Sequence, residues 1–168
     1  ITAWTGVQRD GGYATHMLAD VSAAAHIPDD LDDVEAAPLM CAGVTTFNAL
    51  RHSGAGPGAL VAILGVGGLG HLAVQFAARQ GFRVVAVNRG RDKEAMARSL
   101  GAHDYIDPTE GDPADALRKM GGAKAILATA TNARAMQSVA GGLGANGTMM
   151  IIGAVPSLAI NSLDMIFK

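Results

Sequence analysis

The chain has 168 residues, of which 49% are hydrophobic and 17% charged, and its formal net charge is −2. This composition excludes a disordered chain, and the charge gives no electrostatic reason to expect nucleic acid or an anionic membrane as a partner. Cys41 is the only cysteine, and no signal peptide or membrane-length apolar run is present, so we expect a cytoplasmic protein.

The first 58 residues show only weak patterns. Residues 11–20 alternate loosely, as a strand does, and a helical pattern runs from about Leu31 to Leu50 with a break at Pro38. Residues 1–27 hold too little apolar surface for a core, so we expect a remnant of a catalytic domain followed by a dinucleotide-binding domain at 28–168. Since the chain starts without Met and stops without a helix cap, we expect a fragment.

From residue 59 onward, short apolar runs alternate with helical patterns. Continuous apolar runs are typical of strands buried on both faces of a parallel sheet, and helices between them indicate right-handed crossovers. The sequence therefore predicts an α/β fold with a doubly wound parallel sheet, a Rossmann fold truncated before its last strand. The predicted strands are residues 60–64, 83–87, 104–107, 124–129 and 148–153, and the predicted helix starts are the turn at 65–70 and the caps Asp92, Asp112 and Asn132.

The turn at residues 65–70, GVGGLG, contains the pattern G-x-G-x-x-G between a predicted strand and a predicted helix. Gly65 allows a tight turn, Gly67 lets the backbone approach a pyrophosphate, and Gly70 lets the helix pack closely on the strand. A purely structural glycine turn is the alternative. The strand, spacing and helix together favour a dinucleotide site formed by Gly65, Val66, Gly67, Gly68, Leu69 and Gly70.

The residue about 20 positions further on usually distinguishes the two nicotinamide dinucleotides. An acidic residue there binds the ribose hydroxyls and repels a 2′-phosphate, but this chain has Asn88, followed by Arg89-Gly90-Arg91. The neutral side chain removes the repulsion, guanidinium groups offer a planar fork to phosphate, and Lys93 adds a third cation. We therefore expect NADP to be preferred over NAD. A solvated loop with ordinary surface charges is the alternative.

Five motifs occur in the order and spacing of a known family, and together they cover nearly the whole chain. They are DGGYATHML, HIPDDLDDVEAAPLMCAGVTTFNAL, GVGGLGH, LGAHDYID and GANGTMMIIG. On these motifs the chain resembles the zinc-dependent medium-chain dehydrogenase/reductase family, the alcohol dehydrogenases. The resemblance implies an oxidoreductase that transfers hydride between a small-molecule alcohol or aldehyde and NAD(P), with a homo-oligomeric parent protein.

The resemblance also implies a role for the single cysteine. In the family, the cysteine matching Cys41 is a ligand of the catalytic zinc, and the other ligands lie in an N-terminal catalytic domain. Such a zinc needs three protein ligands and an open position for the alcohol oxygen. We therefore expect zinc in the full-length parent only, and an inactive isolated chain. The alternative for Cys41 is a small buried hydrophobe.

Further residues are assigned by the same resemblance. Thr45 lies one helical turn after Cys41 and is implied to be a catalytic residue that packs against the nicotinamide ring, although its hydroxyl bonding the helix backbone is the alternative. Val66 is implied to support the cofactor by packing. The carboxyl ends of the fourth and fifth strands are implied to orient the carboxamide through Thr129, Ile152, Gly153 and Ala154.

Two other functions share the Rossmann half. A zinc-free quinone or enoyl reductase of the same superfamily has a similar cofactor domain, but those relatives generally lack a residue like Cys41. A non-catalytic nucleotide-binding module, or a methyltransferase-like fold, is the other alternative. The glycine spacing and the basic end of the second strand favour a dinucleotide over S-adenosylmethionine.

Overall fold

The structure is a computed structural model, and it describes residues 5–166 of the chain. The chain forms two compact units, the first ending at Ala36 and the second beginning at Ala37. The assignment of residues 1–27 to a catalytic domain remains a prediction, and residues 1–4 lie outside the described part.

The first unit has little regular structure. None of residues 5–35 is buried, and a 3₁₀ turn at Val21–Ala23 is capped by the Asp20 carboxylate, which accepts the Ser22 N–H at 2.9 Å. The expected strand at residues 11–20 is wrong, because these residues adopt bends and irregular backbone. A strand needs a neighbour for its backbone groups, and residues 11–20 pair with no strand in the described chain.

The predicted helix around Cys41 is present, but Pro38 does not break it. Helix α1 (Asp33–Pro38) is followed directly by a π-helical turn (Leu39–Gly43) and by α2 (Val44–Arg51). The Val44 N–H reaches back five residues to the Leu39 carbonyl. The helix therefore widens locally just after Pro38 and then continues.

The second unit contains the predicted five-stranded parallel sheet, in the order β3-β2-β1-β4-β5. Consecutive strands are joined by helices, so the chain starts in the centre, moves to one edge, and then returns to build the other half. This reversal leaves the carboxyl ends of β1 and β4 side by side, which is where ligands bind in such sheets. The strands are β1 (Leu60–Leu64), β2 (Arg83–Val87), β3 (Asp104–Ile106), β4 (Ala123–Ala128) and β5 (Leu143–Ile151).

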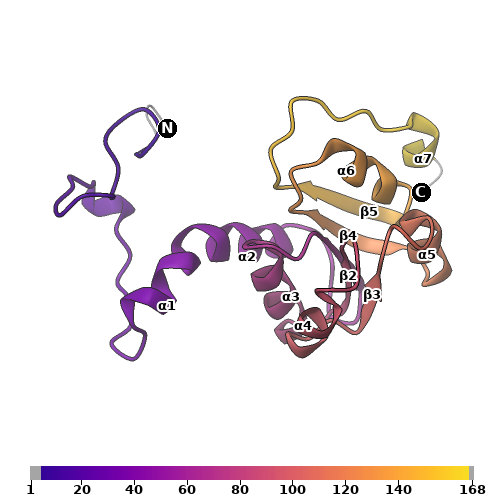
Figure 1. Ribbon diagram of the computed structural model, residues 1–168, viewed down its shortest axis with the longest axis horizontal. Coiled ribbons are helices and arrows are strands. Elements are labelled where there is room, and N and C mark those ends of the chain that lie inside the picture. Colours follow the sequence, from indigo (N-terminus) through magenta and orange to yellow (C-terminus); the bar gives the residue numbers. More distant parts are fainter. Residues whose placement is uncertain (1–4, 167–168) are drawn as a thin grey trace. The chain divides into compact units, whose positions relative to one another are not determined.

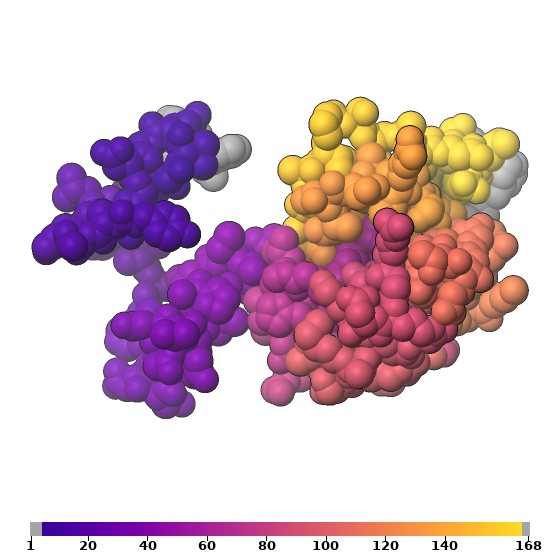
Figure 2. Space-filling model, in the orientation of Figure 1, coloured from indigo at the N-terminus to yellow at the C-terminus, as the bar shows by residue number. Residues whose placement is uncertain are grey.

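Helices cover both faces of this sheet (Figure 1). On one face, α2, α3 (Gly70–Arg79) and α4 (Glu94–Ser99) share a buried cluster with Val61 and Ile63, and on the other, α5 (Pro113–Lys119) and α6 (Ala133–Ala140) share one with Ala62 and Leu64. All five residues of β1 are buried, as its continuous apolar run predicts. Figure 2 shows the closely packed outer atoms of this unit in the orientation of Figure 1. A short helix, α7 (Ser162–Ile166), follows the sheet.

Two predicted boundaries need correction. Strand β5 begins at Leu143, five residues before the expected start at Thr148, because the Ala-Asn-Gly segment is absorbed as an irregularity in its pairing with β4, where Asn146 has φ 52°. Helix α4 begins at Glu94 after Lys93, and the expected cap Asp92 is not at the capping position. Asp112 and Asn132 do cap α5 and α6. No helix among residues 5–166 is long and apolar enough to span a bilayer.

Candidate functional site: a dinucleotide cleft at the carboxyl edge of the sheet

The glycine turn joins β1 to α3 at the carboxyl edge of the sheet. Gly65 has φ 91°, a backbone conformation that side chains disfavour, and its N–H bonds the Val87 carbonyl oxygen at 2.8 Å. An added Cβ atom on Gly70 would lie 1.7 Å from the Gly65 carbonyl oxygen. These two glycines are therefore required by the chain's own folding, and Gly70 has the packing role that its place in the motif predicts.

The two middle glycines are different. Gly67 and Gly68 are exposed, and an added Cβ atom on either would meet no atom within 4 Å. No hydrogen bond within the described chain uses the N–H groups of Gly67, Gly68 or Leu69. An open, side-chain-free surface with unpaired N–H groups at the start of a ten-residue helix fits an anionic group such as a pyrophosphate.

Val66 supports the turn from inside. Its side chain is only 1% exposed and belongs to the core, so it is not available for direct packing against a ligand. Its N–H donates to the Asn88 side-chain oxygen at 3.1 Å, and its carbonyl oxygen accepts from the Lys93 ammonium at 2.9 Å. Asn88 and Lys93, which were both expected to contact the cofactor, therefore also hold the glycine turn in place.

The three expected cations at the end of β2 have three different surroundings. Arg89 is exposed, and its guanidinium has no hydrogen-bond or ion-pair partner among residues 5–166. Arg91 is held by Glu94 at 2.6 Å and by both carboxylate oxygens of Glu110. The Lys93 ammonium is bonded to the Val66 carbonyl oxygen in the turn, so Arg89 is the one of these three cations whose side chain has no hydrogen-bond partner in the described chain.

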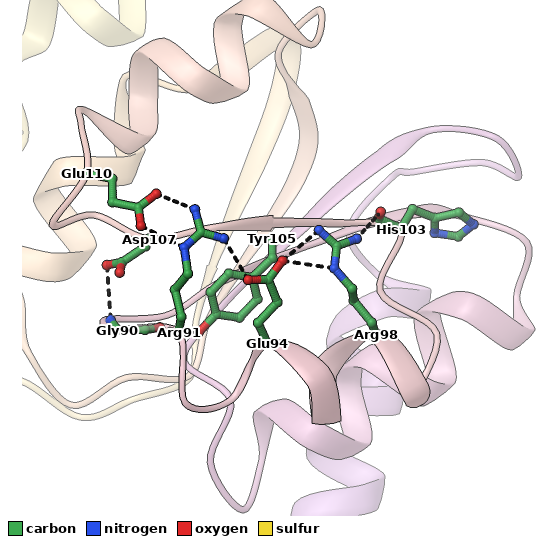
Figure 3. A network of polar contacts seen from close by, with 8 residues as sticks. All are labelled: Gly90, Arg91, Glu94, Arg98, His103, Tyr105, Asp107 and Glu110. Carbon is green, nitrogen blue, oxygen red and sulfur yellow. Dashed lines mark hydrogen bonds and ion pairs between the residues drawn. The ribbon is translucent and has the colours of Figure 1, made fainter.

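A network of polar contacts extends from Arg91 along the ends of β2 and β3 (Figure 3). Glu94 also accepts two hydrogen bonds from Arg98, at 2.8 and 3.0 Å. The hydrogen bonds of Arg91 lower the pKa of Glu94 and Glu110 and raise the pKa of Arg91 itself. The arginines thus compensate the negative charge of both carboxylates, which do not present an unpaired negative charge to a ligand.

The same network contains residues that were not expected from the sequence. The Asp107 carboxylate accepts the Gly90 N–H at 3.0 Å, and the Tyr105 hydroxyl donates to the Gly90 carbonyl oxygen at 2.6 Å. The Thr109 N–H, which donates to the same Asp107 oxygen at 2.9 Å, is the main cause of a lowered Asp107 pKa. The sequence did contain a signal for Asp107, because Asp107 directly follows β3 as Asn88 directly follows β2. Both residues therefore lie at the carboxyl edge of the sheet.

A cleft of about 490 Å³ lies against the glycine turn, within the usual range of small-molecule sites. Arg89 lines it, whereas Arg91 lines a separate hollow of about 260 Å³ together with Glu110. The cleft therefore joins the turn to the unpaired arginine. Its lining residues are Leu64, Gly65, Val87, Asn88, Arg89, Pro108, Thr109, Ala130, Asn132, Ala135 and Ser138.

The ends of β4 and β5 complete this edge. The Thr129 hydroxyl is 2.9 Å from the Leu64 carbonyl oxygen and 3.0 Å from that of Gly65, so it braces β1 against β4. The N–H groups of Ile152 and Gly153 both bond the Ala128 carbonyl oxygen, whereas Ala154 is exposed. Because the N–H groups of Ile152 and Gly153 are already bonded, the backbone groups available to a ligand at this edge are mainly those of Ala154 and the carbonyl groups.

Cys41 and Thr45 are both exposed on the helix that precedes β1. The exposed thiol excludes the buried-hydrophobe alternative for Cys41 in this structure. The neighbouring Thr46 is buried, and its hydroxyl bonds the helix carbonyls of Ala42 and Gly43 at 2.8 and 3.1 Å. The hydrogen bond to the helix backbone that was the alternative for Thr45 is therefore made by Thr46 instead. The Thr45 hydroxyl makes no hydrogen bond within the described chain.

A zinc site is not complete in this structure. Among residues 5–166, no group of three or more His, Cys, Asp or Glu side chains is arranged to hold a metal ion. Cys41 alone does not satisfy the three protein ligands that a catalytic zinc requires. The residues present therefore fit a dinucleotide but not, by themselves, a zinc ion.

Comparison with known proteins shows the family of this chain. The family model described as zinc-binding dehydrogenase matches residues 68–168. An alcohol dehydrogenase from Penicillium expansum is 47% identical over 157 residues, which are 94% of this chain and 46% of that protein. One from Geobacillus stearothermophilus is 44% identical over 149 residues, 88% of this chain and 44% of that protein. The chain thus spans about half the length of the curated relatives it matches.

Solved structures give the same result. A putative zinc-binding dehydrogenase from Sinorhizobium meliloti bound to NADP superposes with a TM-score of 0.84 and 31% identity, over 97% of this chain and 50% of that one. The alcohol dehydrogenase of Aeropyrum pernix gives a TM-score of 0.85 and 30% identity, over 98% of this chain and 50% of that one. From its fold, its glycine turn and these relatives, the chain belongs to the zinc-binding dehydrogenase family.

Proposed function

We propose that this chain is the cofactor-binding part of an NADP-preferring alcohol dehydrogenase. In that activity, hydride passes between an alcohol or aldehyde and the nicotinamide ring of the bound cofactor. The glycine turn binds the pyrophosphate through free N–H groups, and the cleft beside it binds the adenosine. Relatives named alcohol dehydrogenase support this reaction class over a zinc-free quinone or enoyl reductase and over a non-catalytic nucleotide-binding module.

The observation that carries the choice of cofactor is the unpaired Arg89 beside a neutral Asn88. An acidic residue at the end of β2 repels a 2′-phosphate, and Asn88 instead uses its amide to bond the Val66 N–H and the Arg89 carbonyl. Arg89 lines the cleft and is the cation free to bind phosphate there. The NADP bound to the Sinorhizobium meliloti relative is consistent with this assignment.

The helix before β1 contributes to the reaction only in the whole protein. Cys41 is proposed as one zinc ligand, and Thr45 as the residue that packs against the nicotinamide ring. Both side chains are exposed, as a site shared with another domain requires. Because the described residues provide no second and third zinc ligand, the isolated chain is proposed to bind the cofactor without turning over alcohol.

Titrations of the purified chain with NADPH and NADH test this proposal. We expect tighter binding of NADPH, and we expect Arg89→Ala to reduce that preference. A charge-assisted hydrogen bond contributes about 1.5–3 kcal/mol, so the loss should be roughly tenfold to a hundredfold. Arg91→Ala should have a much smaller effect, because Glu94 and Glu110 already bind that side chain.

Arg79→Ala is the matched control, because Arg79 is also exposed but lies in the last turn of α3. It should leave both affinities unchanged. Equal affinity for the two cofactors, or tighter binding of NADH, would overturn the choice of NADP. Absence of binding by either cofactor would overturn the dinucleotide site itself.

A further inference from the structure

The loop carrying Arg89 is unusually well fixed for a segment that ends in an exposed, unpaired side chain. The Asn88 N–H donates to the Ile106 carbonyl at 3.1 Å, and the Asn88 amide donates to the Arg89 carbonyl at 3.1 Å. On the other side of Arg89, both backbone polar groups of Gly90 are bonded. The backbone is therefore held before and after Arg89, while the guanidinium remains available.

The two bonds at Gly90 come from the end of β3. Tyr105 donates its hydroxyl to the Gly90 carbonyl, and Asp107 accepts the Gly90 N–H. We call this pair of contacts the Gly90 clamp. Gly90 has φ 75°, so the turn it makes is one that few residues adopt, and the clamp selects this conformation from those open to glycine.

The clamp is partly shielded from water, unlike the ion pairs around it. Asp107 is only 7% exposed, and Tyr105 is half-buried. The side chains of Arg91 and Glu110 are 55% and 51% exposed, and exposed ion pairs of this kind contribute little to stability. We therefore expect the clamp to constrain the loop more strongly than the surface ion pairs do.

We infer that Tyr105 and Asp107 determine cofactor selectivity by positioning Arg89 through the Gly90 clamp. This inference rests on the proposed function, since it requires Arg89 to bind the 2′-phosphate. A loop fixed before binding loses less conformational entropy when the phosphate arrives. Neither residue touches the phosphate; both act through the loop, so they are positioning residues. NADH lacks the phosphate, and its affinity does not depend on the clamp in this way.

The test is a double-mutant cycle with Tyr105→Phe and Arg89→Ala, measured as dissociation constants for NADPH and NADH. Removing the hydroxyl deletes one hydrogen bond, so we expect Tyr105→Phe to weaken NADPH binding by about two- to tenfold and to leave NADH binding unchanged. In the Arg89→Ala background, Tyr105→Phe should have no further effect. Tyr13→Phe, at a fully exposed tyrosine, is the matched control and should change neither constant.

Two outcomes separate this inference from the proposed function. If the wild-type chain shows no NADPH preference, or Arg89→Ala has no effect, the proposed function fails and the clamp has nothing to position. If both behave as expected but Tyr105→Phe weakens both cofactors equally, or acts as strongly without Arg89, the inference alone is overturned.

A second pair of variants guards against a general loss of structure in Tyr105→Phe. Asp107→Asn keeps an oxygen that can accept the Gly90 N–H, whereas Asp107→Ala removes it. We expect the asparagine variant to retain most of the NADPH preference and the alanine variant to lose it. Equal preference in both variants, with thermal unfolding showing that both fold, would contradict the clamp.

Discussion

Replacing each of two glycines in the β1–α3 turn by alanine should have opposite consequences. In Gly70→Ala, the new Cβ atom would lie 1.7 Å from the Gly65 carbonyl oxygen, whereas Cβ atoms essentially never approach other heavy atoms closer than 3.0 Å. Both atoms are held by backbone, so no side chain can rotate to relieve the contact. In Gly67→Ala the new atom meets nothing within 4 Å.

The magnitudes follow from these two environments. Overpacking a tight site costs about 1–3 kcal/mol, and the Gly70 contact is severe enough for the upper end. For a chain of this size, about 3 kcal/mol corresponds to a fall in Tm of roughly 6–12 °C. Gly67→Ala has no such contact, and it reduces the entropy of the unfolded chain, so its Tm should stay equal or rise slightly. It should nevertheless weaken NADPH binding by about tenfold or more, because the methyl group occupies the surface the pyrophosphate approaches.

Thermal unfolding without ligand and titration with NADPH measure the two effects separately. The decisive pattern is that Gly70→Ala lowers the Tm of the free chain, while Gly67→Ala lowers only the affinity. A Gly67→Ala chain that binds NADPH as tightly as the wild type would refute the placement of the pyrophosphate. A Gly70→Ala chain with unchanged Tm would refute the close approach of α3 to the turn.

Three further predictions concern metal, pH and assembly. Metal analysis of the purified chain should find no stoichiometric zinc, since Cys41 is the only family-implied ligand present, and one tightly held zinc per chain would contradict this. The folded-state pKa of Asp107 is lowered, so the stability that its carboxylate contributes is present above the unfolded pKa and is lost as the pH falls through the folded value. Asp107→Asn should therefore flatten the decline in Tm between about pH 5 and pH 3. Parallel Tm curves for the variant and the wild type would contradict this. Strand β5 is an edge strand with Ile151 56% exposed, so light scattering should show self-association that rises with concentration, and a constant mass near 17 kDa would count against it.

Much of the fold follows from local patterns in the sequence. Short, mainly apolar runs predict β1 and β2 at their observed bounds, and the caps Asp112 and Asn132 predict the starts of α5 and α6. These predictions succeed because burial on both faces of a sheet and helix capping are determined by residues that are close together in the sequence. The helix around Pro38 was predicted to break because the local rule for proline omits the π-helical alternative.

The candidate site was harder to predict, because its electrostatics depend on residues distant in the sequence. Arg89, Arg91 and Lys93 look equivalent in the sequence, yet the structure pairs Arg91 with Glu110, 19 residues away, and bonds Lys93 to Val66, 27 residues away. The glycine motif, in contrast, carries its own geometry. Local sequence therefore predicts the geometry of the glycine turn better than it predicts which of the neighbouring cations has an unpaired side chain.

A crystal structure of the chain with NADPH tests the central claim most directly. We expect the pyrophosphate over Gly67 and Gly68 and the 2′-phosphate within hydrogen-bond distance of the Arg89 guanidinium, with Arg91 still bound to Glu110. A 2′-phosphate bound by Arg91 with Glu110 displaced, or a pyrophosphate away from the glycine turn, would contradict the account.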